Sequence, residues 1–174
     1  DSTKRSSGFG NSIFVIAKRG STQDAPTSCN WSWQKNVALN KKITDWSGQR
    51  VWVIGASAGI GAAFAALLLE RGARVAVSAR SLPSLRSLVQ KYQPERARAI
   101  TLDVRDANQM KTASDALIET WGGYDLVVYC AGTYVPQRAW DFQLDTVREL
   151  FAVNVEGVYT CLSVVIPQLR KQGT

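Results

Sequence analysis

Three closely spaced glycines form the stretch of this chain most suited to chemistry. Gly55, Gly59 and Gly61 lie between an apolar run at residues 51–54 and an alanine- and leucine-rich run at residues 62–69. A strand that turns sharply into a helix presents unpaired backbone N–H groups, which together with the helix dipole favour a bound phosphate. Gly55 would allow the turn, Gly59 would let the backbone approach a pyrophosphate, and Gly61 would let helix and strand pack closely. The stretch predicts a dinucleotide-binding turn, lined by Gly55, Ser57, Ala58, Gly59, Ile60 and Gly61.

Two other interpretations of these residues stay open. The spacing is G-x-x-x-G-x-G rather than the more common G-x-G-x-x-G, so a tight strand–helix turn without a ligand is one alternative. The other is a hydrolase, because Gly55-Ala-Ser57-Ala-Gly59 also matches the G-x-S-x-G nucleophile elbow. A serine nucleophile usually needs a histidine as its base, and the 174 residues contain none. The elbow also normally follows several strands, and here it follows the first credible one, so the hydrolase ranks last.

Arg80 lies where a dinucleotide fold contacts the adenosine ribose. It follows a second apolar strand, residues 74–79, and stands 25 positions after Gly55. An acidic residue at this point binds the 2′-hydroxyl of NAD, whereas Ala79-Arg80-Ser81 offers a guanidinium, which binds phosphate. The prediction is NADP, with NAD less favoured; the alternative is an arginine that only meets solvent.

Two more strand ends carry candidate cofactor contacts, because ligands of open α/β sheets bind at the carboxyl ends of strands. After the third strand, residues 97–102, the Asp103 carboxylate could accept a hydrogen bond from the adenine amino group; a cap or turn acid is an equal alternative. The fourth strand, residues 126–130, ends in a step small enough for a cofactor to pass close to the backbone. The residues assigned to these contacts are Asp103, Val104, Cys130, Ala131 and Gly132.

Four strand–helix units position these residues. Helices are predicted at residues 62–71, 81–92 and 106–121 and from residue 145 to about 166, between and after the strands given above. The recurrence of strand then helix predicts an α/β fold with a parallel sheet and right-handed crossovers. On the last helix Asn154 interrupts an apolar face, where a polar group needs a partner, and a satisfied structural amide is one interpretation.

The composition excludes several classes of protein. Hydrophobic residues make up 45% and charged residues 20% of the chain, as in soluble globular proteins. No apolar run approaches the roughly 18 residues of a membrane helix, which predicts no membrane partner. The three cysteines form no C-x-x-C pair, which predicts a reducing compartment, the cytoplasm, and no structural metal site.

The net charge of +7 is concentrated at the amino-terminal end. Residues 1–43 hold seven Lys or Arg and two Asp, a net +5, whereas residues 44–174 hold fourteen basic and twelve acidic residues, a net +2. Residues 1–43 are also rich in Ser, Thr, Asn and Gly and are predicted to be a disordered or foreign tail. A transit-like segment or a nucleic-acid-binding arm would share this composition. The balanced remainder predicts one NADP-binding domain at residues 44–174 and no nucleic-acid partner.

Taken together these residues resemble the short-chain dehydrogenase/reductase family of compact type. The resemblance covers about residues 48–173 and rests on motifs at proper intervals: Gly55-x-x-x-Gly59-Ile60-Gly61, Ala79-Arg80, Leu102-Asp103-Val104, Cys130-Ala131-Gly132 and Asn154-Val155-x-Gly157. It implies a Rossmann-type doubly wound sheet with strand order 3-2-1-4 and later strands missing from the chain. It also implies an oxidoreductase that moves hydride between NADP and a carbonyl or alcohol substrate. One departure is Tyr129-Cys130, where the family often has Asn-Asn.

The catalytic set that this resemblance implies is present only in part. Asn154 matches the family's proton-relay asparagine, whereas the family's Ser, Tyr and Lys belong to a strand and helix that the 174 residues do not contain. Tyr159 and Lys171 do not form a Tyr-x-x-x-Lys pair. The chain is therefore expected to bind cofactor without turnover, as part of a longer enzyme. A catalytically silent NADP-binding sensor or interaction protein is the alternative.

The resemblance finally predicts self-association. Members of the family commonly dimerise through the long helical region, so a homo-oligomer is expected through the helices after Asp145. The fourth strand is expected to form an unpaired sheet edge, with Phe151, Val158 and Leu162 exposed nearby. Open edges and apolar patches favour association, so we expect marginal stability of the isolated chain.

Overall fold

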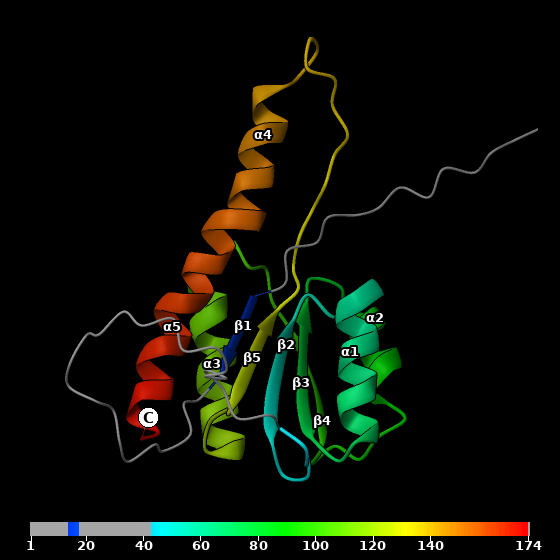
Figure 1. Cartoon of the computed structure of the whole chain (residues 1–174), viewed down its shortest axis with the longest axis vertical. Helices are drawn as coiled ribbons and strands as arrows, with labels where there is room; N and C mark the ends of the chain where they lie inside the picture. The colour runs from blue at the N-terminus through cyan, green and yellow to red at the C-terminus, as the bar shows by residue number, and fades with distance from the viewer. Residues whose placement is uncertain (1–13, 18–42, 174) are drawn as a thin grey trace, which may run out of the picture.

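A computed structural model describes residues 14–17 and 43–173. In this part of the chain a five-stranded sheet has the order β1-β5-β2-β3-β4 and carries helices on both faces (Figure 1). The strands are β1 (Phe14–Ala17), β2 (Arg50–Ile54), β3 (Arg74–Ala79), β4 (Ala97–Thr101) and β5 (Leu126–Tyr129). The four strands from β2 onward are parallel and, counted from β2, stand in the order 3-2-1-4. The predicted doubly wound α/β fold is confirmed.

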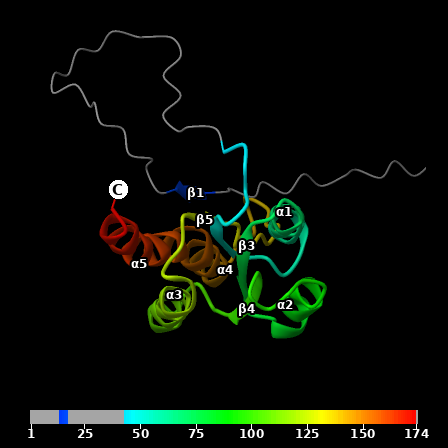
Figure 2. The ribbon, with the colours of Figure 1, turned by 90° about the horizontal axis from the view of Figure 1, so that it is seen from below.

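The helices form one layer on each face of the sheet. Figure 2 shows α1 (Gly59–Glu70) and α2 (Leu82–Val89) on one face, and α3 (Ala107–Trp121) and α5 (Gly157–Lys171) on the other. The observed bounds differ from the predicted ones at three helices: α1 begins at Gly59 rather than residue 62, α2 ends at Val89 rather than residue 92, and α5 ends at Lys171 rather than about residue 166. Asp106 caps α3, because its carboxylate accepts hydrogen bonds from the N–H groups of Asn108 and Gln109.

After Arg50, the residues of β2 are all apolar because both faces of the strand are covered. Successive side chains of a strand point to opposite faces. Val51 and Val53 pack in the core cluster beside α1, and Trp52 and Ile54 pack in the cluster beside α3 and α5. Trp52 is fully buried, and its indole N–H donates a 2.9 Å hydrogen bond to the Ser78 hydroxyl. The one polar group of this large side chain is thereby satisfied.

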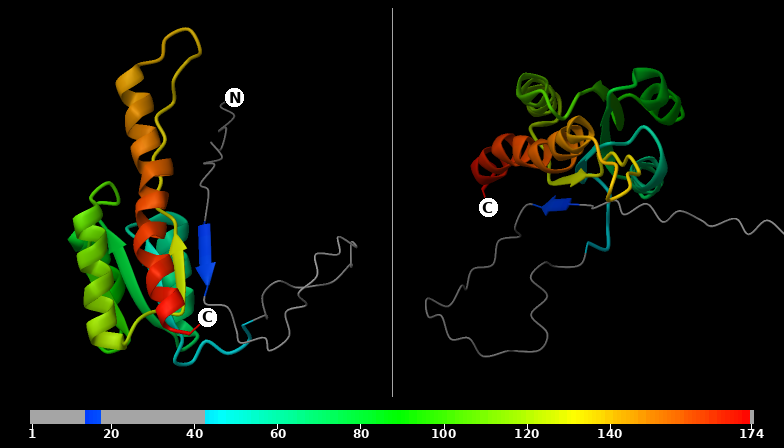
Figure 3. Two further views of the ribbon diagram at one scale, coloured as in Figure 1. Left: turned by 90° about the vertical axis from the view of Figure 1, so that its left-hand side faces the viewer. Right: turned by 90° about the horizontal axis from the view of Figure 1, so that it is seen from above.

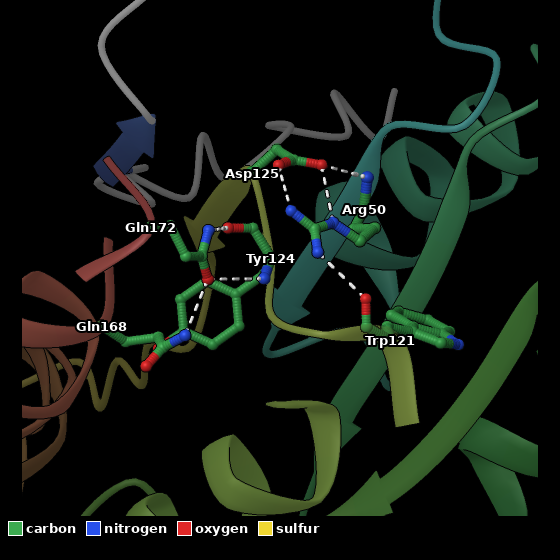
Figure 4. A network of polar contacts seen from close by, with 6 residues as sticks. All are labelled: Arg50, Trp121, Tyr124, Asp125, Gln168 and Gln172. Atoms are coloured by element: carbon green, nitrogen blue, oxygen red, sulfur yellow. Dashed lines mark hydrogen bonds and ion pairs between the residues drawn. The ribbon is translucent and has the colours of Figure 1, made fainter. Parts of the chain in front are cut away.

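A polar network fixes the starts of β2 and β5, which lie at the edge of the sheet away from the glycine-rich turn. The same network anchors the end of α5 (Figure 4). Arg50 donates through Nε and Nη2 to the two carboxylate oxygens of Asp125, at 3.0 and 2.6 Å. Gln172, just past α5, donates from Nε2 to the Tyr124 carbonyl at 2.7 Å and accepts from the Tyr124 N–H at 3.3 Å. The helix end is thus held to the segment that leads into β5.

The predicted helix after Asp145 is one continuous helix of 28 residues, Leu144–Lys171. It consists of α4 (Leu144–Phe151), a π-helical stretch (Ala152–Glu156) and α5. By length and composition alone it could cross a membrane, a test that the core helix of a soluble protein also passes. Its α5 part packs into the core through Val158, Cys161, Val165 and Leu169, while α4 projects beyond the sheet at the top of Figure 1.

This packing corrects part of the expected exposure. Val158 was expected on the surface but is only 7% exposed, because α5 lies against α3 and the sheet. Leu162 is half-buried against the same cluster. Phe151, on the projecting α4, is 58% exposed as expected.

The expectation of an unpaired edge at residues 126–130 is wrong. β1 pairs antiparallel with β5, with Phe14 opposite Tyr129 and Ala17 opposite Leu126 (Figure 3). No strand was predicted at Phe14–Ala17, yet this apolar segment supplies backbone partners to the outer edge of β5. The rest of the predicted tail, residues 1–13 and 18–42, lies outside the described residues, so its disorder stays a prediction.

Candidate nucleotide-binding site

The glycine-rich turn has the geometry that its three glycines predict. Gly55 has a φ of +91°, and a side chain there would run into the backbone of Cys130 and Ala131. The Ser78 carbonyl accepts from the N–H groups of Gly55 and Ala56, at 2.7 and 3.1 Å. Gly61 lies so close to the Gly55 carbonyl that a side chain at position 61 would collide with it. The turn therefore brings β2, the start of α1 and the end of β5 together.

Gly59 differs from its two neighbours because the space beside it is open. Its φ is +62°, and a Cβ atom built there would meet nothing within 4 Å. Ser57, Ala58, Gly59 and Ile60 are all exposed. No side chain caps α1 at Ala58, and the first turn of α1 contains no acidic residue. The helix start thus presents N–H groups and a positive dipole end to an open surface, which fits a phosphate group.

The ends of β3 and β4 bring Arg80 and Asp103 to one edge of the sheet. Arg80 directly follows β3 and is exposed, and the Leu102 N–H donates to the Ala79 carbonyl at 3.0 Å, which holds the two strand ends side by side. The pKa of the Asp103 carboxyl is lowered, mainly because Arg105 donates hydrogen bonds to it, against the opposing effect of burial. The charge of Arg80 also lowers this pKa.

Arg105 is a candidate site residue that was not predicted from the sequence. Its Nη2 donates to one Asp103 oxygen at 2.6 Å, and its Nε lies 3.1 and 3.2 Å from the two oxygens. The Asp103 carboxylate therefore already has a partner, as the alternative of a turn acid requires, and a second guanidinium joins Arg80 at this edge. The Asp-x-Arg spacing was visible in the sequence, but such a pair forms only in some side-chain conformations.

The end of β5 lies directly against the turn. The Cys130 N–H donates to the Ile54 carbonyl at 2.7 Å, and burial raises the pKa of the Cys130 thiol. Ala131 is half-buried and Gly132 is exposed. The side chain of Val104, also assigned to the cofactor, is buried in the core beside Gly157.

Asn154 is held by the loop that follows β5. Its Oδ1 accepts from the Thr133 N–H at 2.9 Å, and its Nδ2 donates to the Thr133 carbonyl at 2.9 Å. Both amide functions are satisfied, as the structural interpretation requires. Asn154 lies in the π-helical stretch, a feature often found at functional sites. Tyr159, one turn further, is exposed and has no lysine four residues later.

The family model for short chain dehydrogenases matches residues 49–174. The chain belongs to this family. Members of the short-chain dehydrogenase family bind a nicotinamide cofactor, NAD or NADP, and the open start of α1 and the space beside Gly59 fit its pyrophosphate.

Several known proteins are similar to this chain. Glycine betaine reductase ATRR of Emericella nidulans is 35% identical over 129 residues, which are 73% of this chain and 10% of that protein. An uncharacterized oxidoreductase of Staphylococcus haemolyticus is 26% identical over 132 residues, 76% of this chain and 57% of that protein. The crystal structure of a short-chain dehydrogenase from Streptomyces avermitilis is 31% identical with a TM-score of 0.67, covering 74% of this chain and 47% of that one.

The chain thus spans about half the length of the bacterial relatives and a tenth of the reductase.

Proposed function

We propose that residues 44–174 are the NADP-binding part of an oxidoreductase that moves hydride between the nicotinamide and the carbon of a carbonyl or alcohol. The observation that carries this proposal is the open, uncapped start of α1 beside Gly59. Family membership and the oxidoreductase relatives support the reaction class. The bound cofactor would supply or accept the hydride. The protein residues bind and orient it.

The preference for NADP rests on the charges at the ends of β3 and β4. Arg80 is exposed there, and no acidic residue takes the place of the carboxylate that would bind the ribose of NAD. A guanidinium forms charged hydrogen bonds with a 2′-phosphate, whereas a carboxylate would repel it. Asp103 is neutralised locally by Arg105, so its charge opposes a phosphate at this edge only weakly.

Titration of the whole chain with NADP and NAD, by calorimetry, tests this assignment. We expect NADP to bind more tightly, and Arg80→Ala to weaken NADP binding by about 1.5–3 kcal/mol while leaving NAD binding nearly unchanged. Arg86→Ala is the matched control, because it removes another exposed arginine, from α2 rather than from the strand end. Equal affinity of the unmutated chain for the two cofactors would rule out the NADP assignment.

The chain itself is proposed to bind without turnover. A general acid or base contributes roughly 10²–10⁴-fold to such a reaction, and the described residues contain no Tyr-x-x-x-Lys pair. Asn154 would hold the loop after β5 beside the cofactor rather than move a proton alone. A catalytically silent NADP-binding sensor would share every binding property. Hydride transfer from NADPH to a simple ketone by the full-length protein would separate the two, since only the enzyme shows it.

A hydrolase at Ser57 is the third candidate. Ser57 is exposed at the start of α1, as an elbow serine should be. No histidine exists in the chain to serve as its base. Labelling of Ser57 by a fluorophosphonate would support this alternative against the dehydrogenase.

We also propose that the protein works in the cytoplasm as a homo-oligomer. The described cysteines, Cys130 and Cys161, are both free and buried, which suits a reducing compartment. The exposed apolar side chains of α4 and the start of α5 provide a surface for a second copy.

A further inference from the structure

The backbone groups of β5 divide between two neighbouring strands. The Cys130 N–H donates to the Ile54 carbonyl of β2 at 2.7 Å, and β5 runs parallel to β2 with Val128 opposite Val53. In an extended strand the N–H and C=O groups of alternate residues point to the same side. Cys130 and Val128 therefore face β2, whereas Val127 and Tyr129 face β1.

The register of β1 decides which of its N–H groups point toward β5 and which point away from the sheet. Phe14 stands opposite Tyr129 and Ile16 opposite Val127, so these two residues form the hydrogen-bonded pairs of the antiparallel ladder. Val15 stands opposite Val128, and its N–H points away from the sheet. The side chains differ in the same way, because Ile16 packs against the core whereas Val15 is 61% exposed.

The outer side of β5 is also where the sheet would continue. The connection from β4 through α3 to β5 carries the chain past β2 to this side. The helix after β5 lies on the same face as α3 (Figure 2). A right-handed connection from β5 across that face places the next parallel strand on the outer side of β5. This is the place that β1 holds.

We propose that the outer edge of β5 is a strand-addition site with room for one strand, and that residues 14–17 are its exchangeable occupant. The partner it fits is an extended apolar segment whose alternate side chains lie opposite Val127 and Tyr129 beside α5. β1 covers edge groups that would otherwise recruit strands of other molecules. β1 and a parallel strand following α5 would exclude one another, because both need the same N–H and C=O groups of β5.

Two proline variants of the whole chain test the assignment of β1. Ile16→Pro removes an N–H that faces β5, and Val15→Pro, its matched control, removes one that faces outward. Amide hydrogen exchange is followed by NMR. In Ile16→Pro we expect exchange at Val127 and Tyr129 to accelerate by about tenfold or more, while Val128 and Cys130 keep their protection. Val15→Pro should leave all four amides nearly unchanged. Equal effects of the two prolines would overturn the proposal.

Two further measurements separate lost pairing from lost packing or lost fold. Ile16→Ala removes the partly buried side chain but keeps the backbone N–H, so it should accelerate exchange less than Ile16→Pro. Protection of Trp52 and Val53 in β2 reports whether the sheet itself is intact. If Ile16→Pro unfolds the sheet, Ile16→Ala is the deciding variant. Loss of the side chain that packs against the core should loosen β1, so unchanged exchange at Val127 and Tyr129 would then contradict the proposal.

Exchangeability is tested by adding the strand in trans. A peptide of residues 11–18, added to the Ile16→Pro chain, should restore protection of Val127 and Tyr129, and the same peptide with proline at position 16 should not. Failure of the first peptide would refute an exchangeable site. Protection of the unmutated chain that grows with protein concentration would show that β1 comes from a second copy, and would overturn its assignment to the same chain.

Discussion

The hydroxyl of Tyr129 donates a 2.8 Å hydrogen bond to the backbone carbonyl of Val153. This bond joins the end of β5 to the π-helical stretch in which Asn154 lies. Gly157 is required at the same place, because a side chain there would meet the Tyr129 hydroxyl and the Val104 side chain. The Tyr129 side chain thus ties the long helix to the end of β5, and the two hydrogen bonds between Asn154 and Thr133 tie it to the loop that follows β5.

We expect Tyr129→Phe to lower the free energy of unfolding by about 1–3 kcal/mol, because the Val153 carbonyl loses its donor in a largely buried position. Chemical denaturation measures this change. Tyr124→Phe is the control, since it removes a buried hydroxyl that pairs with Ser114 away from the π-helical stretch. Only Tyr129→Phe should also alter amide exchange at Thr133. An unchanged exchange rate there would show that Tyr129 does not position the loop.

Replacing Gly157 by alanine should destabilise the protein, although alanine is favoured over glycine in a helix interior by about 1 kcal/mol. The added methyl group meets the Tyr129 hydroxyl. In the double variant with Tyr129→Phe the methyl group has more room, so the two losses should not add. Additive losses in denaturation experiments would contradict a direct contact between these residues.

Substitution by alanine should disrupt folding at Gly55 but mainly cofactor binding at Gly59. Gly55→Ala should disrupt folding, because the new side chain collides with the Ala131 backbone. Gly59→Ala should cost only about 1–2 kcal/mol for the left-handed backbone, since its Cβ meets nothing, yet it fills the space proposed for the pyrophosphate. Circular dichroism and cofactor titration check the two outcomes. Retained cofactor affinity in a folded Gly59→Ala variant would contradict the proposed site.

Stability should fall as the pH rises above about 9. Burial raises the pKa of the Cys161 thiol to about 12 from an ordinary value of 9. Above pH 9 the unfolded chain loses this proton while the folded chain keeps it, so the unfolded state binds fewer protons and unfolding becomes easier until about pH 12. In the Cys161→Ala variant the free energy of unfolding should fall less steeply over this range, by up to about 1.4 kcal/mol for each pH unit. An unchanged slope in denaturation between pH 9 and 12 would contradict the prediction.

Local patterns predicted the fold and the turn well, and contacts between distant residues account for what they missed. Gly55 and Gly61 were assigned their roles from spacing alone, because strand, turn and helix are adjacent in sequence. The π-helical stretch was not predicted, since the sequence around Asn154 has ordinary helical spacing. The Tyr129 hydroxyl that donates to the Val153 carbonyl of this stretch lies 24 residues away in the sequence. β1 was missed for the same reason, because a four-residue apolar run becomes a strand only beside the edge of β5.

The last prediction concerns the exposed apolar stripe of the long helix, formed by Leu144, Phe151, Val155 and Tyr159. These residues recur at intervals of seven, four and four, which places them on one face. All four are exposed, and Tyr159 is 69% exposed. Because β1 covers β5, this stripe rather than a free strand edge should drive association of the chain at micromolar concentration.

Sedimentation velocity of the whole chain and of Phe151→Glu tests this origin of the association. The charge should shift the chain toward monomer without lowering its thermal stability, because Phe151 lies outside both buried core clusters. Leu67→Glu is the matched control, since Leu67 is an exposed apolar residue of α1 on the opposite face of the sheet. If Leu67→Glu dissociates the chain as effectively, or if the unmutated chain is already a monomer, the stripe is not the interface.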